Sequence, residues 1–200
     1  MGRQERAERT RQALVVAAAV EFDRHGFSGT SLSQVSKAAE VTMGALSFHF
    51  PSKNDLAAEV CAQGTAATRA VLDRVAAAPR PGLLAAVDLT LALVRLLELD
   101  VRPRACARLS RDLAPELPSW NSLWCKDMRE LLDRVRPELP SAAAPEGLEP
   151  LVRYLMAGAE ASIREGRLCG GVADELASVW ELLGRGLDLG PLPGPVVRSS

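Results

Sequence analysis

Prolines and glycines divide this sequence into segments of helical length, and no segment shows the period-two alternation of β-branched residues that is typical of a strand. The first helix is predicted over residues 7–24, because Leu14, Ala18 and Phe22 repeat at four-residue spacing and Gly26 follows as a stop signal. The pattern as a whole predicts an all-α protein.

Two short helices with a tight turn between them come next. Ser31 and Gln34 have the spacing of a capping box, in which the serine hydroxyl and the glutamine side chain each accept a hydrogen bond from the other residue's backbone N–H. Thr42 is a candidate N-cap for the following helix, which Pro51 ends, and Ser52 caps a longer one. This order predicts a helix-turn-helix head joined to a second unit.

Further helices separated by proline-rich turns are predicted for the rest of the chain. We expect helices over residues 83–99, 104–113 and 120–135, with a break at Pro103, and a surface loop over residues 137–150. Two final helices have apolar residues at i, i+3, i+4 and i+7 spacing. The stripes are Leu151, Tyr154, Leu155, Gly158, Ala159 and Ser162 in one, and Leu176, Val179, Trp180, Leu183, Gly184 and Leu187 in the other.

The charge of the chain is nearly balanced, with 24 basic and 25 acidic residues, which excludes a polycation that coats nucleic acid. Residues 1–53 hold seven basic and five acidic side chains, so the excess of positive charge lies at the helix-turn-helix end. This excess supports nucleic-acid binding only in combination with the helix-turn-helix pattern.

Motifs for catalysis and metal binding are missing from the sequence. It has 2 histidines, both within residues 1–53, no glycine-rich phosphate loop, and neither a GxSxG nor an HExxH motif. The 4 cysteines lie far apart without a CxxC pair, and we interpret them as reduced thiols. Since the sequence also lacks a secretory signal and any run of eighteen apolar residues, we expect a cytoplasmic protein that is not an enzyme and has no metal or cofactor.

Residues 30–53, TSLSQVSKAAEVTMGALSFHFPSK, resemble the DNA-binding signature of TetR-type transcriptional regulators. The resemblance implies a DNA-binding domain over residues 1–53, whose third helix enters the major groove, and a ligand-binding and dimerisation domain over residues 54–200 with a flexible tail from about residue 188. Helix starts are expected to bind phosphates, and a glycine lets the third helix approach the bases. The expected DNA contacts are Ser31, Ser33, Thr42, Met43, Gly44, Ser47, His49 and Lys53.

Three residues depart from the usual pattern of this family. Glu40 stands where many relatives have glycine, Met43 where they often have lysine, and Ser47 where they often have tyrosine. The last two remove a charge and a phenol that could bind DNA. One interpretation is therefore a receptor-like decoy, or a heterodimer partner with weak DNA binding. Ordinary binding, with Met43 against a thymine methyl group, is the other interpretation.

A narrower resemblance, to the γ-butyrolactone receptors of this family, is carried by residues 22–27, 47–50, 87–90 and 104–109 and a proline-rich turn before Trp120. It implies a repressor of antibiotic biosynthesis genes that a small lactone releases from DNA. A pseudo-receptor that senses an antibiotic or a biosynthetic intermediate is the alternative. Trp120 matches the pocket tryptophan of the branch, and its indole would offer an apolar wall to an acyl chain. The other lining candidates are Thr90, Leu91, Val94 and Leu109.

The final two helices, predicted over residues 151–162 and 176–187, match the place where this family forms homodimers through a four-helix bundle. Small residues within their stripes, Gly158, Ala159 and Gly184, permit close approach of helices. A dimer would place two recognition helices one DNA turn apart on a palindromic operator.

Overall fold

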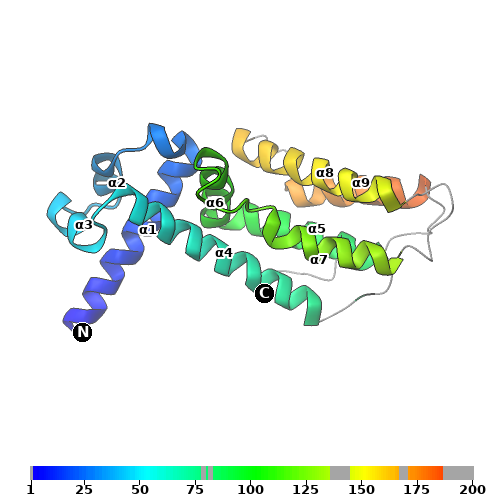
Figure 1. Ribbon diagram of the computed structural model, residues 1–200, viewed down its shortest axis with the longest axis horizontal. Coiled ribbons are helices and arrows are strands. Elements are labelled where there is room, and N and C mark those ends of the chain that lie inside the picture. The colour runs from blue at the N-terminus through cyan, green and yellow to red at the C-terminus, as the bar shows by residue number, and fades with distance from the viewer. Residues whose placement is uncertain (1, 78–79, 81–82, 136–144, 167–170, 187–200) are drawn as a thin grey trace. The chain divides into compact units, whose positions relative to one another are not determined.

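The computed structural model describes residues 2–77, 80, 83–135, 145–166 and 171–186, and within them it contains nine α-helices and no strand, which confirms the all-α prediction (Figure 1). The helices are α1 (Arg3–Gly29), α2 (Leu32–Ala38), α3 (Met43–His49), α4 (Lys53–Ala77), α5 (Leu83–Leu99), α6 (Val101–Asp112), α7 (Ser122–Val135), α8 (Pro145–Glu165) and α9 (Val172–Gly186).

Two compact units make up the chain. The first unit consists of residues 1–67 together with residues 100–121, and the second unit of residues 68–99 together with residues 122–200. Helix α6 therefore belongs to the first unit, although α5 precedes it and α7 follows it in the sequence. These units are defined by contacts between residues. The division predicted after residue 53 instead separates a DNA-binding domain from a ligand-binding and dimerisation domain, and it stays a prediction.

Three of the prolines that were expected outside helices, Pro103, Pro145 and Pro150, lie in helices, so these expectations are wrong. Pro103 is the third residue of α6, whose N-cap Asp100 accepts a hydrogen bond from the Arg102 N–H at 2.9 Å. A proline is tolerated in the first turn because its missing N–H would have no helical partner there. Pro150 lies inside α8, so residues 145–150 are helical and not part of a loop. The expected loop over 137–144 lies outside the described residues.

Helix α1 begins earlier and ends later than its predicted bounds. Gly26, the predicted stop, has φ 71° and ψ −179°, so the helical geometry is interrupted at this residue and resumes through Gly29. The positive φ favours glycine, because a Cβ atom strains this conformation. Gly26 therefore interrupts α1 but does not end it.

The core of the first unit is formed by apolar side chains of α1, α2, α3, α4 and α6. Leu14 and Phe22 of α1 are fully buried, as is Leu46 of α3. Leu109 of α6 belongs to the same cluster, although it is remote in sequence from the others. Because α6 shares this core, it is a structural part of the first unit.

An ion pair connects α1 and α4 within the first unit. The Arg11 guanidinium lies 2.6 Å from Glu59 Oε2 and donates to Glu59 Oε1 at 3.0 Å. This Arg11 hydrogen bond, which outweighs partial burial, holds the pKa of Glu59 below its usual value of 4.5. Such a two-point contact between arginine and carboxylate fixes geometry as well as charge.

Because the pKa of Glu59 is lowered in the folded protein, the stability of the first unit depends on pH. The ionised Glu59 carboxylate contributes to the free energy of unfolding above pH 4.5, and this contribution is lost as the pH falls through the lowered pKa. Glu59→Gln should reduce the free energy of unfolding by about 1 kcal/mol at neutral pH and by less at acidic pH. Urea denaturation at both pH values measures this, and an equal loss at both would contradict it.

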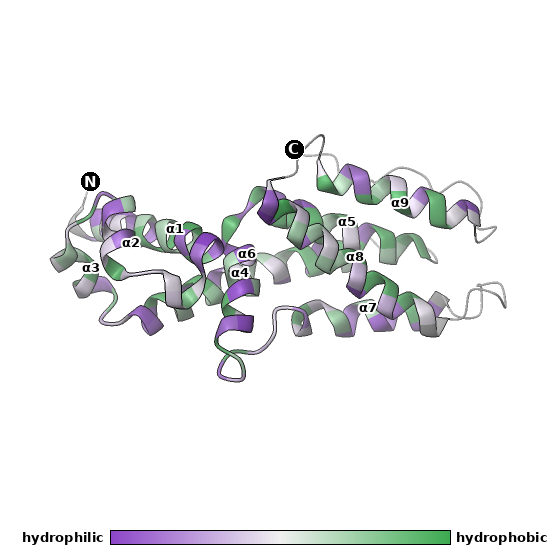
Figure 2. Cartoon of the chain, turned by 90° about the horizontal axis from the view of Figure 1, so that it is seen from above, coloured by the Kyte–Doolittle hydropathy of each residue, from purple (hydrophilic) through white to green (hydrophobic). Residues whose placement is uncertain are grey.

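The second unit is arranged around α5, which is apolar along most of its length (Figure 2) and packs against α7, α8 and α9. The indole Nε1 of buried Trp180 donates to Thr90 Oγ1 at 2.9 Å, and the backbone N–H of Ala173 donates to Glu98 Oε1 at 3.2 Å. Glu98 thus supplies an acceptor to the start of α9 from another helix. Despite the apolar α5, no helix in the described part of the chain is long and apolar enough to cross a membrane.

Candidate nucleic-acid interface

Hydrogen bonds made by the N-cap residues fix where α2 and α3 begin. Ser31 Oγ accepts from the Gln34 N–H at 3.2 Å, and Gln34 Oε1 accepts from the Ser31 N–H at 2.7 Å, so the predicted capping box is confirmed. Thr42 Oγ1 accepts from the Ala45 N–H at 3.2 Å, which confirms the predicted N-cap of α3. Both helices therefore start where the sequence predicted.

The turn between α2 and α3 is held by a side chain that sequence reasoning missed. The buried Ser36 hydroxyl donates to the Val41 carbonyl, while the Val41 N–H donates to the Ser36 carbonyl at 3.0 Å. Glu40 lies between them with φ 55°, in the left-handed region. A serine or threonine four residues before such a position is only a weak sequence signal, because its hydroxyl can bond many neighbouring groups.

Replacing Glu40 by glycine should raise the free energy of unfolding by about 1 kcal/mol, because a non-glycine residue is strained in the left-handed region. Urea denaturation measures the change. Glu40→Ala is the matched control, since it removes the carboxylate but keeps a Cβ atom at the same φ. An equal gain for both variants would assign the effect to charge instead of backbone strain.

Most of the predicted DNA contacts are exposed. Ser31 and Ser33 are exposed at the start of α2, and Thr42 is exposed at the start of α3. Within α3, Met43 and Ser47 are one turn apart on an exposed face that also includes Gly44, beside which an added Cβ would meet nothing within 4 Å. His49 is half-buried. The polar and small side chains of α3 thus face outward, while Leu46 and Phe50 anchor the helix in the core.

Phe48 is a candidate contact that the sequence analysis did not select. Its side chain is 81% exposed on α3, and its ring packs edge-on against His49 with centroids 5.3 Å apart. An exposed phenylalanine has no stabilising role in the core of the chain itself, and apolar groups on a recognition helix can contact thymine methyl groups.

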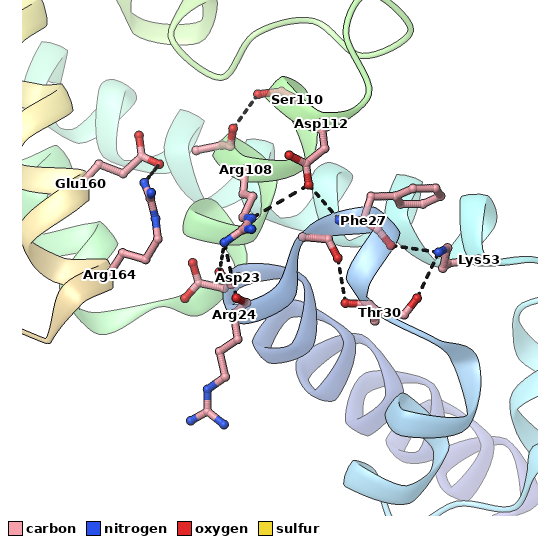
Figure 3. Close-up of polar contacts among 12 residues, drawn as sticks. Asp23, Arg24, Phe27, Thr30, Lys53, Arg108, Ser110, Asp112, Glu160 and Arg164 are labelled. Atoms are coloured by element: carbon pink, nitrogen blue, oxygen red, sulfur yellow. Dashed lines mark hydrogen bonds and ion pairs between the residues drawn. The ribbon is translucent and has the colours of Figure 1, made fainter.

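Lys53 occupies a different environment from the exposed residues. Its ammonium group donates to the carbonyls of Phe27 at 2.9 Å and Thr30 at 3.0 Å, and it lies 4.2 Å from the centre of the Phe27 ring (Figure 3). The ammonium is therefore used to hold the segment between α1 and α2. Because an ammonium has three N–H groups, one remains for the predicted phosphate contact, which stays a prediction.

The residues predicted to line a ligand pocket are buried and are divided between the two units. Trp120 and Leu109 belong to the first unit, whereas Thr90, Leu91 and Val94 lie on α5 in the second. The hydroxyl of Thr90 donates its proton to the Val87 carbonyl at 2.7 Å. The backbone N–H of Trp120 donates to Ser110 Oγ at 3.2 Å, while its side chain is 3% exposed.

Comparison with known proteins identifies the segment that contains α2 and α3. The family model for bacterial regulatory proteins of the tetR family matches residues 14–60. The A-factor receptor protein of Streptomyces griseus is 40% identical over 65 residues, which are 32% of this chain and 24% of that protein. The chain thus matches less than two thirds of the length of this curated relative.

Solved structures extend the similarity to nearly the whole chain. CprB of S. coelicolor A3(2), a TetR family protein, is 30% identical with a TM-score of 0.70, and the match covers 91% of this chain and 90% of CprB. A γ-butyrolactone receptor described as ArpA-like is 27% identical with a TM-score of 0.74, covering 91% and 89% of the two chains. CprB has also been solved in complex with its operator, in a structure 28% identical with a TM-score of 0.72, covering 94% and 90%.

Proposed function

Because the chain belongs to the TetR family of bacterial regulatory proteins, we propose that it is a transcriptional repressor that binds a palindromic operator as a dimer and is released by a small lactone-like molecule. Members of this family regulate transcription and are not enzymes. Within the family, the chain is related to the γ-butyrolactone receptors. We accordingly propose a cytoplasmic regulator of antibiotic biosynthesis genes.

The observation that carries DNA binding is the outward face of α3. Its exposed residues are small, polar or apolar without negative charge, and the helix is fixed at one end by the Thr42 cap and at its back by Leu46 and Phe50. A short, rigid helix of this kind fits the major groove, which admits one α-helix. The proposed DNA contacts are the residues identified from the sequence, together with Phe48.

Dimerisation through α8 and α9 is supported by large apolar side chains that a single chain leaves exposed. Tyr154 on α8 is 70% exposed, and Val179 and Leu182 on α9 are 38% and 66% exposed. Helices α8 and α9 also pack against each other, so these side chains belong to one helical layer. A second copy would bury them, as expected for an exposed apolar patch. Leu187, at the end of the predicted second stripe, lies outside the described residues.

For the ligand, we propose the receptor assignment made from the sequence, with Trp120, Thr90, Leu91, Val94 and Leu109 as lining residues. The related γ-butyrolactone receptors support it. A pseudo-receptor that binds an antibiotic or an intermediate would use the same residues.

A decoy or heterodimer partner with weak DNA binding is the second candidate, and the position of Lys53 favours it. Two of the three ammonium N–H groups of Lys53 are already donated to Phe27 and Thr30 carbonyls. Met43 and Ser47 also add neither charge nor phenol to α3 for binding phosphate.

Fluorescence anisotropy distinguishes the repressor from the decoy or heterodimer partner. The protein is titrated into DNA from upstream of its own gene and from other candidate promoters, with scrambled DNA at the same moderate salt as the control. The repressor should bind at least one promoter much more tightly than the scrambled control, and an organic extract of the producing culture should reverse the binding. Equal weak binding to every DNA would contradict the repressor and support the decoy.

A further inference from the structure

Two cysteines of the first unit lie on helices that come together only in the folded chain. Cys61 is on α4 and Cys106 is on α6, and both helices contribute apolar side chains to the core of that unit. In the part of the chain that the structure describes, both are free thiols, as is Cys125 of the second unit. Neither Cys61 nor Cys106 belongs to the proposed DNA contacts or to the dimer surface, so a role for them is a separate question.

Helical spacing on α4 directs Cys61 toward Cys106. Gly64 and Thr65 follow Cys61 by three and four residues, so these three residues share one face of α4. A Cβ atom on Gly64 would lie 2.8 Å from the Cys106 Cβ atom, and Thr65 Oγ1 lies 3.9 Å from Cys106 Sγ. The face of α4 that carries Cys61 is therefore the face against which Cys106 packs.

A hydrogen bond joins the two thiols across this contact. Hydrogen bonds from the Cys61 thiol and the Thr65 hydroxyl lower the pKa of Cys106 although the side chain is buried. The hydrogen bond to Cys106, together with burial, raises the pKa of Cys61. Deprotonation therefore occurs first at Cys106, with Cys61 as a proton donor to the thiolate. The thiolate is the form of cysteine that attacks oxidants.

The backbones of α4 and α6 approach each other closely beside the two thiols. A Cβ atom on Gly64 would also lie 2.7 Å from the Arg102 carbonyl oxygen, so no side chain separates the helices there. A disulfide requires Cα atoms within about 7 Å of each other, which close packing at a glycine favours. Cys61 is partly exposed whereas Cys106 is 4% exposed, so a small reagent reaches the pair from the side of Cys61.

We propose that Cys61 and Cys106 are a modification site for hydrogen peroxide, which converts the two thiols to a disulfide between α4 and α6. The Cys106 thiolate attacks one peroxide oxygen, so an S–O bond forms, the O–O bond breaks, and hydroxide leaves and takes up the proton that Cys106 lost. The Cys61 sulfur then displaces the hydroxyl of the sulfenic acid, and the S–S bond forms as water leaves with the Cys61 proton. Peroxide is thereby reduced to water and the two thiols are oxidised. The inference does not rest on the proposed function, because it concerns only the chemistry of the two thiols.

The test treats the full-length wild-type protein with hydrogen peroxide, alkylates the remaining thiols and maps the peptides by mass spectrometry. We expect a pair of peptides joined through Cys61 and Cys106 in most molecules, and dithiothreitol should restore both thiols. The midpoint of thermal unfolding should rise by about 5 °C in the oxidised protein, because the cross-link restricts the unfolded chain.

Two variants separate the pair from cysteine oxidation in general. Cys61→Ser should abolish both the joined peptides and the rise in the unfolding midpoint. Cys125→Ser is the matched control, since it removes a partly exposed thiol of the second unit and should leave both results unchanged. Because the bridge is mapped in the wild type, the test decides the question even if Cys61→Ser does not fold.

Three results would overturn the inference. If Cys125 is oxidised while Cys61 and Cys106 remain thiols, the pair is inert packing in the core. Sulfinic acid at Cys61 or Cys106 without a bridge would show that the two sulfur atoms do not meet. Bridges from either residue to Cys125 or to a second chain would show that the folded geometry does not select the partner.

Discussion

Replacing Gly64 by alanine is expected to lower the free energy of unfolding by about 2 kcal/mol, the middle of the range for overpacked interiors. A Cβ atom at Gly64 of α4 would lie 2.7 Å from the Arg102 carbonyl oxygen and 2.8 Å from the Cys106 Cβ atom of α6. The carbonyl is part of the backbone and cannot rotate away, so α4 and α6 must separate. Urea denaturation of the purified variant measures the loss.

Gly147→Ala is the matched control for this substitution. Gly147 is exposed within α8, and an added Cβ would meet nothing within 4 Å. The same chemical change should there raise the free energy of unfolding by up to about 1 kcal/mol, because alanine is the better helix former. Opposite signs for the two variants are expected, and a gain at both positions would contradict the close approach of α4 and α6.

Thr42→Asp is expected to weaken operator binding about 100-fold while the protein stays folded. Aspartate caps a helix as well as threonine does, so the hydrogen bond to the Ala45 N–H should persist. Its carboxylate would face a DNA phosphate, and two like charges about 4 Å apart repel by up to about 4 kcal/mol near a protein surface. Anisotropy on the operator, with thermal unfolding in parallel, measures both properties.

Thr42→Ser keeps the hydroxyl and should bind the operator within about threefold of the wild type. The pair of variants separates the charge from the cap, because both retain a side-chain acceptor at the start of α3. Unchanged binding by Thr42→Asp would remove Thr42 from the proposed DNA contacts, even if the chain binds DNA elsewhere.

The helix-turn-helix could be predicted in detail because its signals are local. Ser31 and Thr42 form their cap hydrogen bonds with residues three positions later, so residue type and spacing are sufficient. The prolines were harder to interpret, since Pro103 is compatible with a helix when it lies in the first turn and is disruptive elsewhere. The outcome depends on where α6 begins, which Asp100 decides three residues before the proline.

Long-range contacts could not be predicted from the sequence. Phe27 and Asp112 are 85 positions apart, and no local pattern indicates that a carboxylate of α6 would pair with the interrupted end of α1. Lys53 was predicted to bind DNA from its place in a motif, but the two carbonyls that it contacts become neighbours only after folding. Sequence spacing identifies which side chains can bind, whereas packing decides which of them are already engaged.

The membership of α6 in the first unit has a consequence for protein engineering. A fragment that ends after α4 would contain the whole helix-turn-helix motif, but it would lack Leu109 from its core and the Asp112 carboxylate that accepts from the Phe27 N–H near the end of α1. The simplest hybrid regulator would join the head of one chain to the body of another at a single point. For this chain such a hybrid needs two additional junctions, on either side of residues 100–121, so that α6 travels with the head it supports.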